Sequence, residues 1–179
     1  MARIRKFSSY QNLERPYTRI SKYTKKNFVR GGFPHMKISR FDMGDVGRKF
    51  DLTLRLNVTR SMNIRHNSLE AARMTSNRLL EKVVGKEYHF RLKVYPFHVL
   101  RENPLASGAG ADRMSTGMSA AYGKAISCAA RLFNGQTLFE LRVNKPHLKT
   151  AREALERAAK KVPCGCKIVT IDNTVKVAN

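Results

Sequence analysis

Two stretches of the chain alternate between hydrophobic and polar residues, which is the two-residue period of a strand with one buried face. The first covers residues 50–58 and the second covers residues 88–94. Pro96 interrupts the second stretch, and residues 97–101 predict a further short strand beyond it. The exposed side of the second strand is expected to carry His89, Arg91 and Lys93, beside Tyr95.

Two other stretches repeat hydrophobic or small residues every three or four positions, and the first of them predicts an amphipathic helix from about Leu69 to Val83. Asn67, followed by Glu70 three residues later, resembles a capping box at the start of this helix. Gly85 is well placed to end it, because glycine adopts the left-handed backbone conformation without strain.

The second helix is expected to open at Pro146, because a proline in the first turn removes no intrahelical hydrogen bond. Its buried face would run from Ala151 to Val162, and Pro163 would end it. Residues 166–171 then predict a last strand, so that a helix and a strand close the chain.

Asn134-Gly135 lies between two apolar runs, residues 126–133 and residues 136–143. An Asn-Gly pair in this position is the strongest short-range signal for a β-hairpin. The predicted order is therefore strand, helix, strands, hairpin, helix and strand. This order indicates an α+β domain of two layers, in which two helices pack against a mostly antiparallel sheet.

The charge balance indicates what kind of partner the protein has. The 179 residues include 35 Lys and Arg against 13 Asp and Glu, a net charge of +22. Because such a surplus repels itself in a compact protein, we expect a polyanion to neutralise it. No apolar run approaches the roughly 20 residues that cross a bilayer, so a membrane is disfavoured. The basic start, Met1–Lys6, precedes no apolar segment, and we expect an unprocessed cytoplasmic protein.

The first 40 residues differ from the rest, and we predict a basic extended arm over residues 1–40 and an α+β core domain over residues 41–179. The arm has eleven basic residues, one acidic residue and six aromatic residues, without a persistent helical or strand period. Disordered tails are poor in aromatic residues, so this composition favours an arm that becomes ordered on RNA over a solvated tail. Its predicted RNA-binding residues are Arg3, Arg5, Lys6, Arg15, Arg19, Lys22, Lys25, Lys26, Arg30 and Lys37.

Residues 102–117 predict a long loop that is rich in Gly, Ala and Ser. Gly108-x-Gly110 suggests a dinucleotide-binding turn, but the third glycine is absent, and so is the Gly-Lys-Ser/Thr ending of a Walker A loop. Small residues let backbone amides approach a phosphate or a base closely, and we favour this role over a surface loop without a target. In the body, the predicted RNA-binding residues are Arg91, Lys93, Arg101, Arg113 and Lys124.

Enzymatic chemistry is not indicated by the remaining residues. His98 has serines and an aspartate nearby in sequence, but no nucleophile-elbow motif is present, so a structural or RNA-stacking histidine is favoured. Three cysteines are too few for a four-ligand zinc site or a disulfide framework, and inert thiols are favoured over metal ligands or a redox pair. We predict no enzyme activity, no metal, no cofactor and no small-molecule substrate; the cysteines are Cys128, Cys164 and Cys166.

Residues 95–101, 108–118 and 121–124 form three distinctive blocks, with the sequences YPFHVLR, GAGADRMSTGM and AYGK. Together with Arg30-Gly31-Gly32 and Leu69–Arg73, they resemble the universal large-subunit ribosomal protein sixteen family over about residues 15–170. The archaeal and eukaryotic branch, called protein ten of the eukaryotic set, fits better than the bacterial one. The chain ends near Asn179 without the longer eukaryotic extension, so we expect an archaeal source.

The resemblance implies an α/β-hammerhead-type fold, bound to large-subunit rRNA in the cleft between the central protuberance and the stalk base, beside neighbouring large-subunit proteins. It also implies that the loop points toward the peptidyl-transferase region and the tRNA acceptor ends, where it helps to position tRNA. Gly108 stands where family members often have Cys, which removes a side-chain role there. The implied tRNA-proximal residues are Ser107, Gly108, Ala109, Gly110, Ala111 and Asp112.

Three hypotheses for the function follow from these observations. The leading one is a structural constituent of the large ribosomal subunit, and the second is a free-standing RNA-binding or RNA-chaperone module. The third is a small nucleotide-using enzyme. The salt dependence of RNA binding separates the first two from the third, since each neutralised phosphate steepens that dependence. Co-sedimentation with large subunits separates the first from the second.

Overall fold

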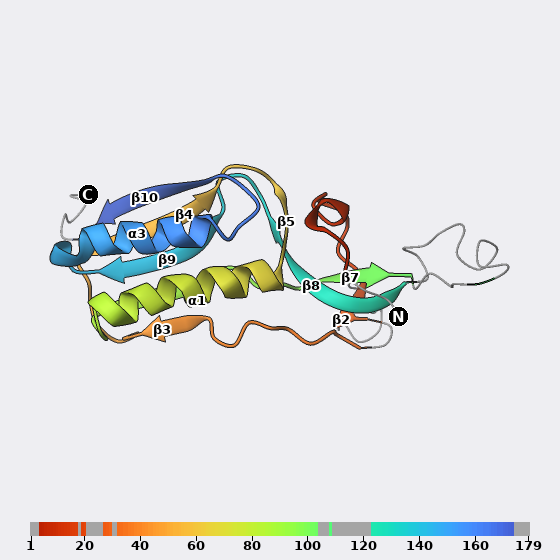
Figure 1. Ribbon diagram of the computed structural model, residues 1–179, viewed down its shortest axis with the longest axis horizontal. Coiled ribbons are helices and arrows are strands. Elements are labelled where there is room, and N and C mark those ends of the chain that lie inside the picture. Colours follow the sequence, from red (N-terminus) through yellow and green to blue (C-terminus); the bar gives the residue numbers. More distant parts are fainter. Residues whose placement is uncertain are drawn as a thin grey trace.

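The computed structural model describes residues 4–17, 19–20, 27–29, 32–103, 108 and 123–173. Within these residues, two helices cover a five-stranded sheet, and a three-stranded sheet extends from one end of that body (Figure 1). The arm contributes a 3-10 turn and a short strand pair. These arm elements are η1 (Phe7–Ser9), β1 (Arg19–Ile20) and β2 (Asn27–Phe28).

The five-stranded sheet has the order β10-β4-β9-β6-β3, and every neighbouring pair is antiparallel. One of its faces is covered by α1 (His66–Val83) and α3 (Leu148–Ala159), which lie side by side (Figure 1). The predicted α+β architecture, with two helices on a mostly antiparallel sheet, is confirmed. The strands are β3 (Asp42–Gly44), β4 (Leu52–Val58), β6 (Tyr88–Leu92), β9 (Thr137–Val143) and β10 (Cys166–Asp172).

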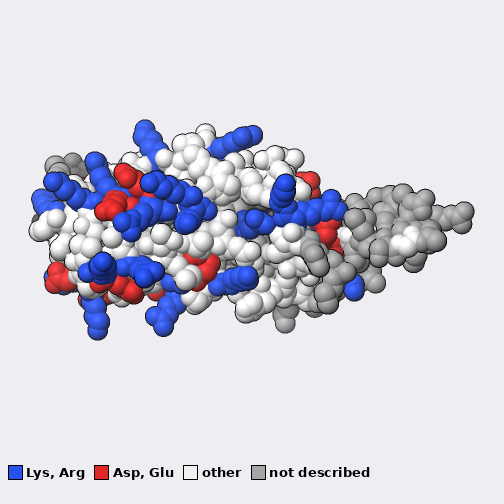
Figure 2. Space-filling view, in the orientation of Figure 1, with Lys and Arg blue, Asp and Glu red and all other residues white. Residues whose placement is uncertain are grey.

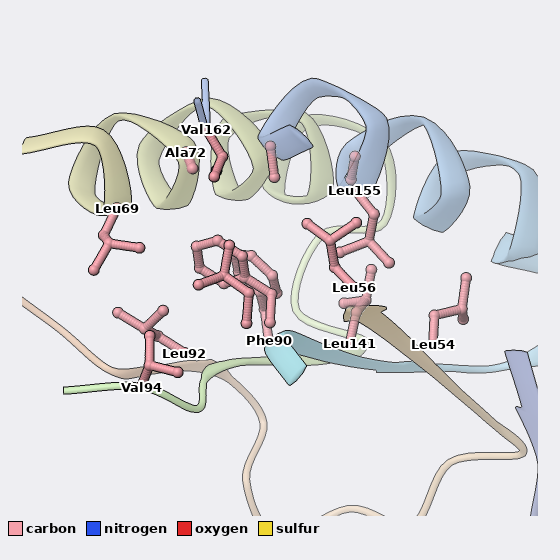
Figure 3. Packing of buried hydrophobic residues seen from close by; sticks show 14 of the residues in the cluster. Leu54, Leu56, Leu69, Ala72, Phe90, Leu92, Val94, Leu141, Leu155 and Val162 are labelled. Carbon is pink, nitrogen blue, oxygen red and sulfur yellow. The ribbon is translucent and has the colours of Figure 1, made fainter. Parts of the chain in front are cut away.

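The hydrophobic core fills the space between this sheet and the two helices (Figure 3). Strand alternation turns Leu56 and Phe90 toward the helices, where Leu69 and Leu155 meet them, and all four side chains are fully buried. The rings of Phe90 and Phe139 stack with their centroids 5.0 Å apart. Burying each such side chain stabilises the fold by about 1.5–3 kcal/mol, so these layers form the stable part of the molecule.

The second sheet has the order β5-β8-β7 and is also antiparallel; its strands are β5 (Met62–Arg65), β7 (His98–Glu102) and β8 (Lys124–Leu132). The predicted hairpin of β8 with β9 is wrong, because these strands belong to different sheets. Asn57 faces Thr137 and Met62 faces Leu132, so the pairing resumes five residues after Asn57 on one segment and five residues before Thr137 on the other. Segments β4–β5 and β8–β9 therefore form one long bent ribbon that joins the two sheets.

Asn134-Gly135 forms a turn at the bend of this ribbon rather than at the tip of a hairpin. The Gln136 N–H donates to the Phe133 carbonyl at 3.1 Å, and Gly135 has a φ of 80°. The Gly135 N–H then donates to the carbonyl of Val58, at the end of β4, at 2.8 Å. The turn at Asn134-Gly135 was predicted correctly, but the strand that it contacts, β4, is distant in sequence.

The helix boundaries agree with the predictions in part. Helix α1 begins at His66, so Asn67 lies inside it, no side chain caps its N-terminus, and the predicted capping box is wrong. Glu70 instead accepts hydrogen bonds from Arg73 at 2.6 and 2.8 Å. Gly85 follows the last turn with a φ of 72°, as predicted. Pro146 lies in a short 3-10 turn, η2 (Lys145–His147), that leads directly into α3.

Parts of the arm contact the body directly. The backbone N–H of Asn63 in β5 donates to the carbonyl of Gln11 at 3.0 Å, and that of Lys37 donates to Nδ1 of His66 at 3.1 Å. Ile38 is buried in the core cluster. Across the described residues, no helix combines the length and the apolar character needed to cross a membrane.

Candidate nucleic-acid interface

The base of the long loop is the point where β7 ends and β8 begins. Glu102 and Lys124 face each other as the last pair of this antiparallel ladder. Gly123 approaches the backbone of Glu102 so closely that a Cβ atom would lie 2.9 Å from its N and C atoms. We call Arg101, Glu102, Gly123 and Lys124 the loop base. It fixes where the loop leaves the body.

Two tyrosines and an arginine of the arm pack against this loop base. Arg5 forms an ion pair with Glu102 at 2.5 Å, and the hydroxyl of Tyr10 donates to the same carboxylate at 3.2 Å. The guanidinium of Arg101 lies 3.4 Å from the centroid of the Tyr17 ring, which is a close cation–π contact. The arm and the loop base therefore form one surface, in which Glu102 contacts a basic and an aromatic side chain of the arm and Arg101 contacts a second aromatic ring.

His98 anchors the arm to β7. Its Nδ1 atom accepts a hydrogen bond from the backbone N–H of Tyr17 at 3.2 Å, and its side chain is buried. Burial lowers the pKa of His98, and the charges of Arg131 and Arg101 lower it further. The neutral ring is thus favoured, and of the two predicted roles the structural one is observed.

The second group of basic residues lies on the face of the five-stranded sheet that the helices leave open. Its centre is Glu140 in β9, whose carboxylate is buried yet contacts Arg142 at 2.7 Å, Arg55 at 3.3 Å and Lys93 at 4.0 Å. Burial alone would raise the pKa of Glu140, but the hydrogen bond from Arg142 and the three positive charges outweigh it and lower the pKa.

Arg91 and His89 extend this group toward β3. Arg91 pairs with Asp42 at 3.4 Å, and Nε2 of His89 lies 3.0 Å from the same carboxylate. Arg91 and Lys93 are exposed as predicted, but His89 is buried, so the expected exposed histidine is wrong. The reason is the edge strand β3, which pairs with β6 and brings Asp42 next to the ring. We call Arg55, Arg91, Lys93, Arg142, Glu140 and Asp42 the open sheet face.

Several predicted RNA-binding residues stand apart from both groups or outside the described residues. Lys6, Arg15 and Lys37 are exposed along the arm, and Arg19 lies in β1. Gly108 has a φ of +130°, a conformation that favours glycine. The other predicted residues of the arm and the loop lie outside the described residues: Arg3, Lys22, Lys25, Lys26, Arg30, Ser107, Ala109, Gly110, Ala111, Asp112 and Arg113.

The distribution of charge differs between the two ends of the molecule. Figure 2 shows basic and acidic side chains mixed over α1 and α3, whereas basic side chains predominate around η1, next to β7. On α3, Arg157 pairs with Glu153 at 2.6 Å, one helical turn away. The mixed helix surface is typical of ordinary solvation, as expected from the sequence.

Sequence reasoning missed Arg55 and Arg142 on the open sheet face, and Tyr10 and Tyr17 as contacts of the loop base. Alternation in residues 50–58 gave a usable signal for Arg55, because it assigns Arg55 to the side opposite the core. No local signal shows which strands become neighbours, so the convergence of three cations on Glu140 required the structure.

The three cysteines are free thiols. Burial raises the pKa of Cys128 to about 11, which keeps that thiol protonated. The Sγ atoms of Cys164 and Cys166 lie 3.9 Å apart and interact with each other. Among the described residues, no group of three or more His, Cys, Asp or Glu side chains is placed to hold a metal ion.

Comparison with known proteins identifies the family. The family model described as "Ribosomal protein L16p/L10e" matches residues 18–169. Curated relatives named large ribosomal subunit protein uL16 include one from Methanocella arvoryzae, 45% identical over 82% of this chain and 86% of the relative. Another, from Staphylothermus marinus, is 44% identical over 87% of this chain and 90% of the relative. The predicted family and its archaeal branch are confirmed, and the chain belongs to the ribosomal protein L16p/L10e family.

Proposed function

We propose that this protein is a structural constituent of the large ribosomal subunit in the cytoplasm, where it binds large-subunit rRNA and contacts neighbouring large-subunit proteins. Family membership and the net charge of +22 support this function. The observation that carries the proposal is the loop base, where the arm and β7 meet. Arg5 on the Glu102 carboxylate, Arg101 over Tyr17 and the neighbouring Lys124 give this surface three basic residues, which suits phosphates because most protein–nucleic acid hydrogen bonds go to the backbone.

Within that function, we propose that the loop over residues 102–117 reaches the tRNA acceptor ends near the peptidyl-transferase region. The support is the family resemblance and the composition of residues 107–112, whose small side chains allow backbone amides to approach RNA. The packed loop base holds the two ends of such a loop in a fixed position, and in this sense it is a rigid mount for the loop. In this role the protein positions RNA, and it forms and breaks no covalent bonds.

Salt titration with purified large-subunit rRNA tests the rRNA-binding part of this proposal. Each neutralised phosphate contributes about −0.7 to −0.9 to the slope of log affinity against log salt concentration, so several contacts give a steep slope. A nucleotide-using enzyme would instead show a shallow slope and turnover. The proposal fails if the protein shows no steep salt dependence with this rRNA.

Co-sedimentation tests assembly into the particle. The full-length protein, mixed with large subunits that have been depleted of it by a salt wash, is expected to sediment with them in moderate salt. Protein that stays wholly in the supernatant while still binding naked RNA would instead indicate a free-standing RNA chaperone. Chemical footprinting of the acceptor end of bound tRNA, with and without residues 108–111, tests the contact of the loop with tRNA.

A further inference from the structure

The open sheet face carries more positive charge than its own carboxylates can neutralise. Four basic side chains face two carboxylates, which leaves a net charge of +2 on this part of the sheet. The four basic side chains are between 39% and 48% exposed, whereas Glu140 beneath them is 4% exposed. The carboxylate therefore holds the cations in place from below, and their outer sides remain available to an anion.

An exposed aromatic ring follows β6 two residues after Lys93. Tyr95 is 53% exposed, and its ring stacks on Phe41 with the centroids 5.6 Å apart and an interplanar angle of 20°. Phe41 packs against the core, and its carbonyl accepts a hydrogen bond from the N–H of Leu92 at 2.8 Å. One face of the Tyr95 ring thus packs on a residue that contacts the core. Because the ring is already held in place, little conformational entropy is lost when a ligand stacks on it.

Two of the basic side chains and the ring come from alternate positions of one chain segment. Exposure alternates through this segment, so that Arg91, Lys93 and Tyr95 are all on the exposed side while Leu92 and Val94 are buried. Alternate Cα atoms of an extended segment are roughly 6.6 Å apart, at about 3.3 Å per residue, while the charged group of Arg91 reaches toward Asp42 in β3 and that of Lys93 toward Glu140 in β9. A ligand that presents a flat ring next to negative charges would match the aromatic ring and the cations beside it.

We propose that the open sheet face binds an unpaired nucleotide of folded RNA, with the base stacked on Tyr95 and the adjoining phosphates held by Lys93 and Arg91. The inference rests on the proposed function and adds a second RNA contact, on a different surface from the loop base. Phosphates on the cations supply affinity without sequence preference, and stacking on a supported ring selects an unpaired base over a paired one.

An acidic protein segment is the competing occupant, and two observations favour RNA. Three of the four cations are arginines, whose planar guanidinium matches a phosphate through two parallel hydrogen bonds. A half-exposed tyrosine would add little to the binding free energy of a carboxylate-rich peptide. Stacking of a base on an aromatic ring, by contrast, contributes substantially to the affinity of single-stranded nucleic acid. The combination of ring and cations is thus better matched to a nucleotide.

The test uses the full-length protein and an RNA hairpin with one bulged 2-aminopurine, whose fluorescence is quenched when the base stacks. Wild type is expected to quench the bulged base and to bind this hairpin more tightly than the fully paired one. Tyr95→Ala should abolish the quenching and weaken binding by roughly tenfold, whereas Tyr95→Phe should retain both. Circular dichroism of each variant shows whether the fold is intact.

A charge-matched pair of variants tests the phosphate contacts. Arg91→Gln with Lys93→Gln should reduce the salt slope by about 1.4, at about 0.7 per contact on single-stranded RNA. The control, Lys160→Gln with Lys161→Gln, removes the same charge at the exposed end of α3 and should leave the slope close to that of wild type. Equal losses from both pairs would overturn the proposal, because they would reflect net charge alone.

The remaining outcomes separate this inference from the proposed function. If wild type binds large-subunit rRNA and enters the subunit, but Tyr95→Ala quenches 2-aminopurine as wild type does, only the nucleotide site is wrong. If Tyr95→Ala keeps full affinity for rRNA but loses its contact with another large-subunit protein, the face belongs to a protein partner, which also overturns the inference. Failure of wild type to bind rRNA at all would remove the proposed function itself.

Discussion

Replacing Gly123 by alanine tests whether the packing of the loop base determines how the long loop leaves the body. Gly123 directly precedes β8 and packs against the end of β7. A methyl group there would lie 2.9 Å from the backbone N and C atoms of Glu102 and 3.1 Å from Cβ of Arg101. All three neighbours belong to the strand from which the loop departs, so no flexible side-chain end can move aside.

The size of the effect follows from these distances. An ordinary van der Waals contact begins at 3.4 Å, so the two strands must separate by at least 0.5 Å (3.4 − 2.9) to admit the methyl group. Overpacking of this kind typically costs about 1–3 kcal/mol. The same displacement would shift Glu102, which holds Arg5 and Tyr10 of the arm.

Urea unfolding of Gly123→Ala, with affinity for large-subunit rRNA measured in parallel, provides the assay. We expect a lower unfolding midpoint and weaker rRNA binding than in wild type. Gly47→Ala is the matched control, because the nearest atom to its added Cβ is Oδ1 of Asp45, at 3.8 Å. If Gly123→Ala proves as stable and as tightly bound as Gly47→Ala, the loop base is not the rigid mount described above.

Three further predictions concern the pH dependence, the loop and the arm. Burial lowers the pKa of His98 below 6.5, so as the pH falls this histidine binds a proton in the unfolded chain before it does so in the folded protein. The contribution of His98 to the free energy of unfolding should therefore be fully present above about pH 6.5 and be lost as the pH decreases below it. His98→Asn should weaken that dependence in urea unfolding, and an unchanged pH profile would contradict the assignment. Arg101→Ala, or deletion of residues 108–111, should leave the thermal midpoint nearly unchanged while reducing translation by reconstituted subunits; unfolding of either variant, or normal translation, would count against the proposed role. Deletion of residues 1–16 should reduce incorporation into subunits, because it removes Arg5 and Tyr10 from Glu102, and equal incorporation in a sedimentation assay would refute this.

Local chemistry was sufficient to predict most of the helices and strands. Alternation around residues 50–58 and 88–94 located β4 and β6, and Gly85 marked the end of α1 correctly. These signals succeed because side-chain periodicity and left-handed glycine depend only on neighbours in sequence. The capping box at Asn67 failed because the chain enters α1 directly from β5, which places this residue inside the helix.

The pairing of strands could not be predicted from the same signals. Asn134-Gly135 gave the turn, but the flanking strands pair with residues 52–65 and with β6 and β7, about which the turn sequence has no information. The same limit explains why only part of the candidate site could be predicted from the sequence. Arg91 and Lys93 were identified from strand alternation, whereas Glu140 and its contacts depend on β4, β6 and β9 being neighbours.

The bent ribbon of β4–β5 and β8–β9 has a consequence for how the molecule opens. Because β4–β5 and β8–β9 each run from the larger sheet into the smaller one and pair with each other in both, the two sheets are joined through two paired chain segments. The two sheets should therefore exchange their amide protons as a single cooperative unit. A displacement of the loop base would therefore be resisted by both sheets together and not by β7 and β8 alone.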